Sequence, residues 1–399
     1  MRYKLITEEL LILRDGHPFG ENGIFGGNSL NWPFPQTIAG MVRTAAGFSY
    51  DPSYFSNENP TYENNIKKIL NIGISKLLTM SNINCQWLSL MPAPADLILT
   101  QQSDKTELTV NPLIYKNIDK DTGTDIANRQ WLIPFVHIND KQAKETPFLF
   151  HWNFYDRYLQ GEIKSEETLL FKDIGINPPI NEIRMHNAID PKTFTTEESK
   201  LFSNAGFYLK TKHDDKIIDL AIFFDVTNAE HDATPVNISG DACLGGERKR
   251  VILSETDLLF PECPDYFNKQ NFLKVILTSH GDFGGWCPDW LKPDLGADRI
   301  KWVKIPDTDF EIRLRSSCVN GWDAVSGWDY KTKQPKATKK LVRPGSVYII
   351  EIHNPDESDK IAKIFWGGNL NMDNKASVYN GYSQCIVGNA IIDNSKGDI

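Results

Sequence analysis

The stretch Trp32-Pro-Phe-Pro-Gln-Thr-Ile-Ala-Gly-Met-Val-Arg-Thr44 contains the clearest local pattern in this sequence of 399 residues. Its apolar residues recur at the spacing of one helical face, at Ile38, Met41, Val42 and Ala45. The pattern predicts a short helix over residues 35–47, which Gly47 is expected to end. Arg43 lies on the opposite face, so we expect it to point away from the core.

The flanking sequence predicts a chain built mostly from strands. A second helix is expected over residues 62–80, and a hairpin is expected where two apolar runs flank the turn 213–216. Residues 101–180 mix short strands with an aromatic patch, which indicates an insertion or a set of long hairpins. Further strands are predicted at residues 2–13, 86–91, 272–278, 310–316 and 345–353, with a loop at 92–96.

Chain length and the order of these elements predict an α+β protein with two domains and antiparallel sheets. A chain of 399 residues exceeds one ordinary core. Its strands are separated by few helices and come in two rounds, as in two small α+β units. We place the first domain at residues 1–205, with the insertion around 101–180, and the second at 206–399.

The composition is that of a soluble globular protein, with 40% hydrophobic and 24% charged residues. No apolar run approaches the roughly 20 residues of a membrane span, and Glu8 and Glu9 interrupt the apolar start, which argues against a secretory signal. The six cysteines form no CxxC pair, so no zinc site is expected and the scattered thiols fit the cytoplasm. No cofactor is implied.

The net charge of −9, from 43 basic and 52 acidic residues, at first counts against nucleic acid as a ligand. The distribution is more informative than the sum. Between Tyr330 and Ile350 the sequence has six basic residues and no acidic one. Such a run is compatible with a solvated loop and with a phosphate-binding segment.

Common catalytic fingerprints are missing: the sequence has no P-loop, nucleophile elbow, HExxH or Rossmann motif. Two His-Asp pairs, at 213–214 and 231–232, resemble metal-ligand dipeptides, but their setting favours turns. His17, His186 and His280 are candidate general bases, although a lone histidine is more often structural or in contact with a ligand.

A set of ordered segments resembles the RAMP superfamily in its type III-B CRISPR (Cmr) branch, and within it the family of the third Cmr subunit. The resemblance begins with Leu13-Arg-Asp-Gly-His-Pro-Phe19 and the stretch quoted above, and it spans roughly residues 5–390. The later segments are Pro94-Ala-Asp96, His186-Asn-Ala-Ile-Asp190, Leu201-Phe-Ser203, Cys243-Leu-Gly-Gly-Glu-Arg-Lys-Arg250, Ser326-Gly-Trp-Asp329, Pro335-Lys-Ala-Thr338 and Pro344-Gly-Ser-Val-Tyr348.

The resemblance implies two ferredoxin-like, RRM-related domains that bind the repeat-derived 5′ tag of the guide RNA (crRNA). The chain would pack against the large polymerase-type (Cas-ten-like) subunit and the backbone RAMP subunits, and would meet target RNA only indirectly. Tag-binding members of this superfamily resemble the non-catalytic subunits of the effector. Two positions depart from the pattern: His17 stands where arginine is common, and Ser383 stands where a second glycine is expected in the carboxyl-terminal loop 380–388.

Residue chemistry supports RNA contacts at several of these segments. A helix amino terminus at 35–37 can bind a phosphate group through its backbone N–H groups. Paired glycines at 245–246 allow an RNA backbone to approach the protein backbone closely, beside three basic residues. Exposed aromatic residues can stack on unpaired bases. The candidate RNA-binding residues are Arg14, His17, Phe19, Gln36, Thr37, Arg43, His186, Asn187, Gly245, Gly246, Arg248, Lys249, Arg250, Lys336, Lys339, Lys340, Gly381 and Tyr382.

Ordinary structural roles remain open for the same residues. Thr37 can cap the helix, Arg43 can pair with a nearby acid, Phe19 can be core, and Glu247 can hold an arginine of the 244–250 run. Two other functions also remain open. One is a repeat-processing endoribonuclease on the same fold, with His17, His186 and Arg43 around a 2′-hydroxyl. The other is a scaffold subunit without RNA contact.

Overall fold

The computed structural model describes residues 1–13, 26–27, 29–56, 58–102, 106–118, 130–228, 237–297, 299–329 and 334–393. Arg14, His17 and Phe19, the pair 231–232, and Lys331 and Lys333 lie outside these ranges. Within the described ranges, every helix is too short or too polar to cross a membrane.

The first large sheet is antiparallel along its main path, and the amino-terminal strand lies inside it. β1 (Arg2–Ile6) lies between β14 (Lys216–Asn228) and β16 (Lys249–Glu255), so Leu5 pairs with both Ile222 and Leu253. The path runs β11-β9-β4-β3-β14-β1-β16-β15. The remaining strands of this path are β3 (Ile72–Ile83), β4 (Gln86–Pro92), β9 (Leu149–His151), β11 (Gly175–Ile176) and β15 (Gly240–Leu244).

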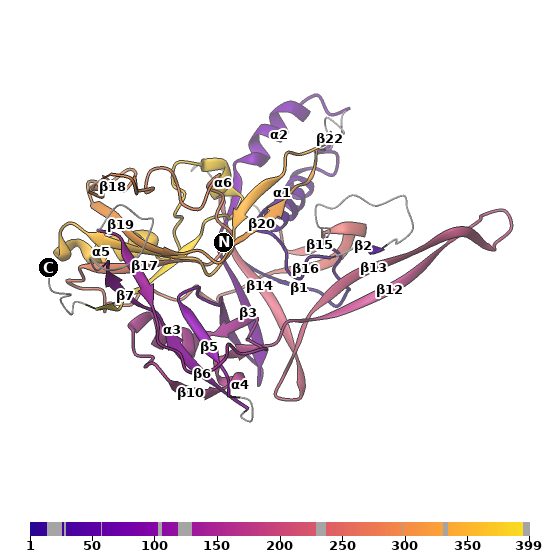
Figure 1. Cartoon of the computed structure of the whole chain (residues 1–399). Coiled ribbons are helices and arrows are strands. Elements are labelled where there is room, and N and C mark those ends of the chain that lie inside the picture. Colours follow the sequence, from indigo (N-terminus) through magenta and orange to yellow (C-terminus); the bar gives the residue numbers. More distant parts are fainter. Residues whose placement is uncertain are drawn as a thin grey trace.

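Two helices lie above this sheet in Figure 1: α1 (Pro35–Tyr50) and α2 (Tyr62–Leu70). α1 buries Ile38 and Val42 against Leu5 and Phe224 of the sheet, so the helical face marked by the apolar spacing is the packed one. The predicted helix is therefore confirmed, but it continues past Gly47 to Tyr50. A side chain at Gly47 would collide with Phe55, which explains the glycine by packing rather than by helix termination.

The second sheet has the order β18-β19-β24-β17-β25. Its core is continuous with the other face of the first sheet, because Leu78 and Phe223 share one buried cluster with Val275 and Ile350. Its strands are β17 (Phe272–Leu277), β18 (Val303–Lys304), β19 (Glu311–Cys318), β24 (Val347–Ile352) and β25 (Cys385–Asn389). Helical elements near this sheet and its loops are α3 (Trp152–Gln160), η2 (Pro355–Glu357), α5 (Ser358–Phe365) and α6 (Lys375–Tyr379).

The described residues between 97 and 176 form small sheets and helices, together with β9 and β11 of the first sheet. Their aromatic patch is largely core, since Phe154, Tyr155 and Tyr158 are at most 3% exposed. The three-stranded sheets are β10 (Glu167–Leu170)-β6 (Glu107–Pro112)-β5 (Leu97–Thr100) and β26 (Ile392–Asp393)-β7 (Ile114–Asn117)-β8 (Leu132–Phe135). The short elements elsewhere are α4 (Phe171–Ile174), η1 (Gly246–Arg248), β2 (Gly26–Gly27), β20 (Trp322–Val325), β21 (Trp328–Asp329), β22 (Gln334–Pro335) and β23 (Lys339–Val342).

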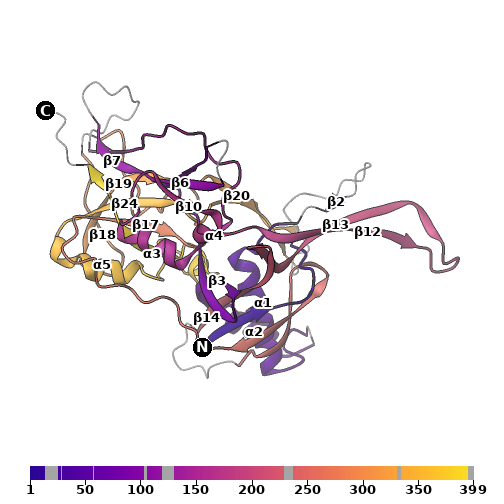
Figure 2. The ribbon, with the colours of Figure 1, turned by 90° about the horizontal axis from the view of Figure 1, so that it is seen from below.

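The long hairpin follows this region. β12 (Pro179–Ile189) and β13 (Thr196–His213) pair along their length and project from the body of the protein in Figures 1 and 2. β13 then turns into β14 through Asp214 and Asp215, both with positive φ, so the predicted turn at 213–216 is confirmed and takes the residues a tight hairpin favours. The position between residues 205 and 206 lies inside β13, and the domain division there stays a prediction.

Two predicted elements need correction: the strand expected over 2–13 ends at Ile6, and the second helix was placed too far along the chain. The expected helix over 62–80 ends at Leu70, and residues 72–83 form β3 instead. β3 is held between β4 and β14, and it buries Leu78 and Met80 on the side it shares with the second sheet. The predicted strands at 86–91, 272–278, 310–316 and 345–353 are confirmed. The fold class is mixed α/β with several antiparallel sheets, while the ferredoxin-like arrangement stays a prediction.

Candidate nucleic-acid interface

A small hydrophobic cluster fixes the hairpin β20/β23 over the start of α1. Phe34, the residue before α1, packs with Val325 of β20, Leu341 of β23 and Tyr382. Figure 1 shows β20 beside α1. Because the cluster contains Phe34 together with one residue from each strand of the hairpin, the hairpin has a defined position relative to the helix amino terminus.

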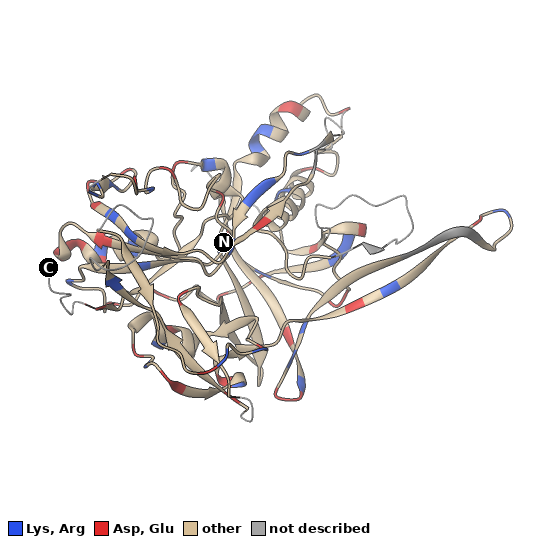
Figure 3. Cartoon of the chain, viewed as in Figure 1, with Lys and Arg blue, Asp and Glu red and all other residues tan. Residues whose placement is uncertain are grey.

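This hairpin carries three of the cations in the basic run. Lys339 lies 2.9 Å from Asp282, yet its side chain is 57% exposed. Lys340 lies over the Trp322 ring, with Nζ 4.6 Å from the ring centroid. Arg343, just after β23, pairs with Asp323 at 2.8 Å. Figure 3 marks basic residues on this hairpin. The Lys339 side chain is mostly exposed, so its ion pair is weak enough to exchange for a phosphate contact.

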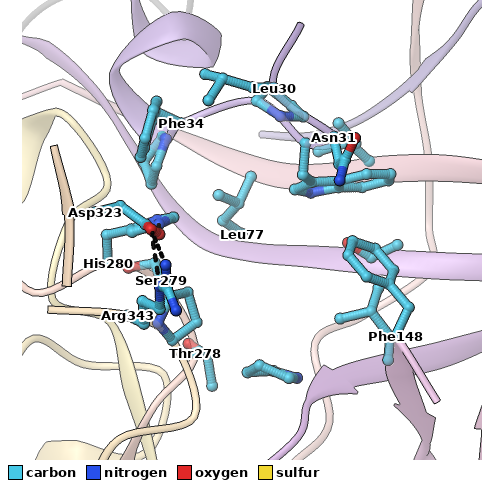
Figure 4. Close-up of a pocket in the computed structure, with 18 of the residues that line it drawn as sticks. Leu30, Asn31, Phe34, Leu77, Phe148, Thr278, Ser279, His280, Asp323 and Arg343 are labelled. Atoms are coloured by element: carbon cyan, nitrogen blue, oxygen red, sulfur yellow. Dashed lines mark hydrogen bonds and ion pairs between the residues drawn. The ribbon is translucent and has the colours of Figure 1, made fainter. Parts of the chain in front are cut away.

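A cavity of about 790 Å³ opens between this hairpin, the start of α1 and the first sheet. One end is aromatic, with Trp32 and Phe148 at 6.0 Å between ring centroids. The other end holds His280, Asp323 and Arg343, as Figure 4 shows, and the His280 ring lies 4.7 Å from that of Phe34. The cavity therefore combines flat apolar walls with one polar end.

Asp323 is the centre of that polar end. His280 Nε2 lies 3.2 Å from one carboxylate oxygen, and Arg343 Nε donates to the other at 2.8 Å. The hydrogen bond with His280 and the one from Arg343 lower the pKa of Asp323, which keeps the carboxylate ionised near neutral pH. A carboxylate held from two sides presents a fixed hydrogen-bond acceptor to the cavity.

Arg43 does not point away from the core, so that expectation is wrong. Its guanidinium donates to Ile72 O at 2.8 Å, to Asn380 Oδ1 at 2.7 Å and to Tyr379 O at 3.4 Å. Burial lowers the pKa of the Arg43 side chain. The expected acidic partner is also replaced by carbonyl groups, and the residue ties α1 to β3 and to the end of α6.

Replacing Arg43 with methionine is expected to lower the free energy of unfolding by about 2 kcal/mol, because three acceptors lose their donor. Urea denaturation of the full chain measures this. Arg248→Met removes an exposed arginine and should change stability by less than about 0.5 kcal/mol. If Arg43→Met instead weakens RNA retention without loss of stability, Arg43 contacts RNA.

At the start of α1, Gln36 is half-buried and Pro35 lines the cavity. The amino-terminal cap is Phe34, and Thr37 bonds through its backbone N to Phe34 O at 2.9 Å. No side chain caps this helix, so the capping role left open for Thr37 is wrong. Gln36 and Thr37 directly follow Pro35 in the first turn of α1, and phosphate contact by these two residues stays a prediction.

The glycines of the run 244–250 approach the chain's own amino-terminal segment. Gly245 has φ +74, and a Cβ there would lie 2.6 Å from Ile12 O. Gly246 N donates to the same oxygen at 2.7 Å. The close backbone approach expected at these glycines is thus made to the protein itself.

The cations of that run lie on η1 and β16. Glu247 pairs with Lys249 at 3.2 Å rather than with an arginine, and Arg250 pairs with Asp241 at 2.9 Å. Arg248 is exposed. Glu247 therefore does not hold an arginine, and RNA contact by Arg248, Lys249 and Arg250 stays a prediction.

The carboxyl-terminal loop is packed rather than open. Tyr382 is 1% exposed and belongs to the cluster below the hairpin, so its ring has no surface for a base to stack on. Gly381 has φ +78 and lies against Ile74. Ser383, where glycine was expected, adopts φ +60, and its hydroxyl accepts from Asp282 N at 3.2 Å. This hydrogen bond supports a conformation that glycine usually takes.

Whole-chain comparison identifies the family. The chain matches the family model described as CRISPR-associated protein (Cas_Cmr3) over residues 4–390. The chain belongs to the Cas_Cmr3 family. This confirms the resemblance and makes the chain a subunit of the type III-B CRISPR effector. No curated protein matches the sequence.

The solved structures that are similar to this Cas_Cmr3 member share little sequence identity with it. A cryo-EM structure of the type III-B Cmr-beta bound to cognate target RNA and AMPPnP matches with TM-score 0.49 and 16% identity, covering 96% of this chain and 95% of that chain. A second, bound to cognate target RNA, has TM-score 0.44, 16% identity, and coverage of 88% and 86%. A type III-A Csm3-Csm4 subcomplex has TM-score 0.32, 11% identity, and coverage of 87% and 92%.

Two of the three residues proposed for an endoribonuclease lie in the part of this Cas_Cmr3 member that the structure describes, and they belong to different elements. His186 and Asn187 lie on β12 of the projecting hairpin, whereas Arg43 is held at α1. His17 lies outside the described residues. Among the residues that the structure describes, no group of three or more His, Cys, Asp or Glu could hold a metal ion.

Sequence reasoning missed a buried ion pair that joins two parts of this family member. Asp96 and Lys274, at 0% and 1% side-chain exposure, lie 3.1 Å apart. Tyr115 and Tyr158 both donate to the Asp96 carboxylate, and burial together with its charge raises the pKa of each tyrosine well above the usual value. The only signal was the segment Pro94-Ala-Asp96, which matched the family without revealing its partner.

Proposed function

We propose that this chain is the non-catalytic subunit that holds the repeat-derived 5′ tag of the crRNA in the type III-B effector. It would anchor the large polymerase-type subunit at that end and contact the backbone RAMP subunits in the cytoplasm. The observation that carries the proposal is the basic hairpin β20/β23, fixed over the start of α1 at the mouth of a cavity. Target RNA would be met only indirectly, with specificity left to base pairing.

The physical argument is that a single strand needs phosphate partners and flat apolar surfaces together. Lys339 and Lys340 provide cations on adjacent positions of β23, while α1 opens beside them with Pro35 at its first turn. Lys336, also exposed, precedes the hairpin strand. The acidic balance of the chain then leaves surface away from the RNA for basic partners.

Replacing Lys339 and Lys340 together with alanine is expected to weaken crRNA retention in the assembled effector. Each lost phosphate contact should also reduce the slope of log affinity against log salt by about 0.7. A salt titration of crRNA binding, with mutant and parent complexes side by side, measures both effects. Lys304→Ala is the matched control, because Lys304 is also exposed and ion-paired but lies on β18, away from β20 in Figures 1 and 2.

The scaffold alternative predicts a different result. If the double variant and Lys304→Ala retain crRNA equally and with equal salt slopes, the hairpin holds no phosphate and the tag-binding proposal fails at this surface. Cleavage of repeat RNA by the purified chain would instead favour the endoribonuclease. Neither outcome depends on folding, since the lysines are exposed.

A further inference from the structure

We propose that the cavity accepts one unstacked base of the bound RNA, and that Asp323 selects a base with an exocyclic amino group. This inference rests on the proposed function, because it assigns the base-reading part of the same RNA site. It adds a ligand class to the cavity and a specificity role to a single carboxylate.

The shape of the cavity suits a planar ring. Its volume of about 790 Å³ exceeds that of one base, and its walls are mainly apolar. Trp32 and Phe148 meet edge to face at one end, while Leu77 lies between that end and His280 in Figure 4. Aromatic and aliphatic surfaces of this kind stabilise an unstacked base without regard to its identity.

Base identity would be read at the polar end. Asp323 faces the cavity with a carboxylate that His280 and Arg343 hold in place. An ionised carboxylate only accepts hydrogen bonds. Adenine, cytosine and guanine carry an exocyclic amine that donates, whereas uracil presents two carbonyl oxygens on either side of its one N–H. The carboxylate would repel those oxygens, so we expect uracil to be disfavoured.

The phosphate partners lie on the strand next to Asp323. In the β20/β23 pair, Asp323 is opposite Leu341 and Ala324 is opposite Lys340. Because neighbouring residues of a strand alternate between its two faces, Asp323 shares a face with Lys339, which is opposite Val325, and Lys340 shares the other face with Ala324. A nucleotide whose phosphate lies on β23 can place its base in the cavity below the same hairpin.

The other charged groups around Asp323 are paired within the protein. Arg343 is 51% exposed and neutralises the carboxylate, and Lys339 is paired with Asp282. The polar end thus carries little net charge. Selection of a base there depends on which of its atoms donate or accept hydrogen bonds. Lys339 and Lys340, in contrast, would attract the phosphate by charge.

The test uses the full chain in the assembled effector and crRNAs in which one tag position at a time is abasic. We expect one position to weaken retention by about tenfold, with small effects at the others. At that position, replacing the base by an analogue without the exocyclic amine, inosine for adenosine or guanosine and uridine for cytidine, should also weaken retention. Asp323→Asn should remove the difference between base and analogue, because an amide both donates and accepts.

Ala324→Trp provides a second variant that does not touch the carboxylate. Ala324 is exposed and lines the cavity, so the larger side chain can occupy it without disturbing the core. This variant should make the sensitive position indifferent to base removal. An equal response at every tag position, with the lysine effect intact, would overturn the base pocket alone. Loss of the lysine effect as well would overturn the proposed function.

Discussion

Replacing Asp96 with asparagine is expected to lower the free energy of unfolding by about 3–5 kcal/mol, the largest effect of any single change proposed. Lys274 would be left as an ammonium at 1% exposure without a counter-charge. Tyr115 and Tyr158, which donate to the Asp96 carboxylate, would keep only a neutral acceptor. Urea denaturation of the full chain, followed by fluorescence, gives the shift in midpoint.

The double variant Asp96→Asn/Lys274→Met is the control, because it removes both charges and fills similar volume. It should be more stable than the sum of the two single changes predicts, since neither residue then leaves a lone buried charge. Strict additivity would contradict this and would mean that the pair contributes no coupling energy.

Replacing Gly345 with alanine is expected to destabilise the chain by more than about 2 kcal/mol. Gly345 has φ +84, and a Cβ there would lie 2.0 Å from Ala93 O. The same glycine accepts a hydrogen bond from Ala95 N at 2.8 Å. The change would therefore push away the loop that carries Asp96 and, through Ala93, a wall of the cavity.

Gly284→Ala is the matched control for this second prediction. Gly284 has φ +68, but no atom lies within 4 Å of its would-be Cβ. The substitution should lower the free energy of unfolding by only about 1 kcal/mol, because alanine is less stable than glycine in the left-handed conformation. Thermal unfolding of both variants separates the two causes. Equal shifts in the melting temperature would show that the approach of Gly345 to Ala93 contributes nothing.

Local sequence patterns correctly predicted the elements whose conformation depends on neighbouring residues. The apolar spacing from Ile38 to Ala45 identified α1, and the Asp214-Asp215 turn identified the hairpin that enters β14. In both cases neighbouring residues decide the conformation. The family resemblance likewise depended on the order of short segments, and it was confirmed over residues 4–390.

Tertiary contacts decided where the local patterns failed. Residues 72–80 were expected to extend a helix, but they are paired as β3 with strands on both sides. A set of long hairpins was one of the two interpretations of residues 101–180, but the long hairpin of the structure is formed by β12 and β13, from Pro179 to His213. Arg43 looked outward on a helical wheel, yet Asn380, which is 337 positions away, approaches that face and binds it.

The candidate site could be predicted only in part for the same reason. The basic run marked Lys339 and Lys340, but nothing in the sequence joined Asp323 to His280, which are 43 positions apart. Tyr382 was expected to contact RNA as part of the loop 380–388, whereas in the structure it packs in the cluster that supports the hairpin. Charge partners and cavities are formed by residues that are distant in sequence, so the spacing of residues along the chain does not predict them.

The internal position of β1 has a consequence for how the protein is made. β1 is synthesised well before its two neighbours, β14 and β16, so Leu5 waits for Ile222 and Leu253. At ribosomal rates of about 5–20 residues per second, roughly 12 to 50 s pass before both have been added. During that interval Tyr3 and Leu5, fully buried in the finished sheet, have no strand beside them. Until β14 and β16 have both emerged, β1 is an unpaired apolar strand of the kind that favours aggregation.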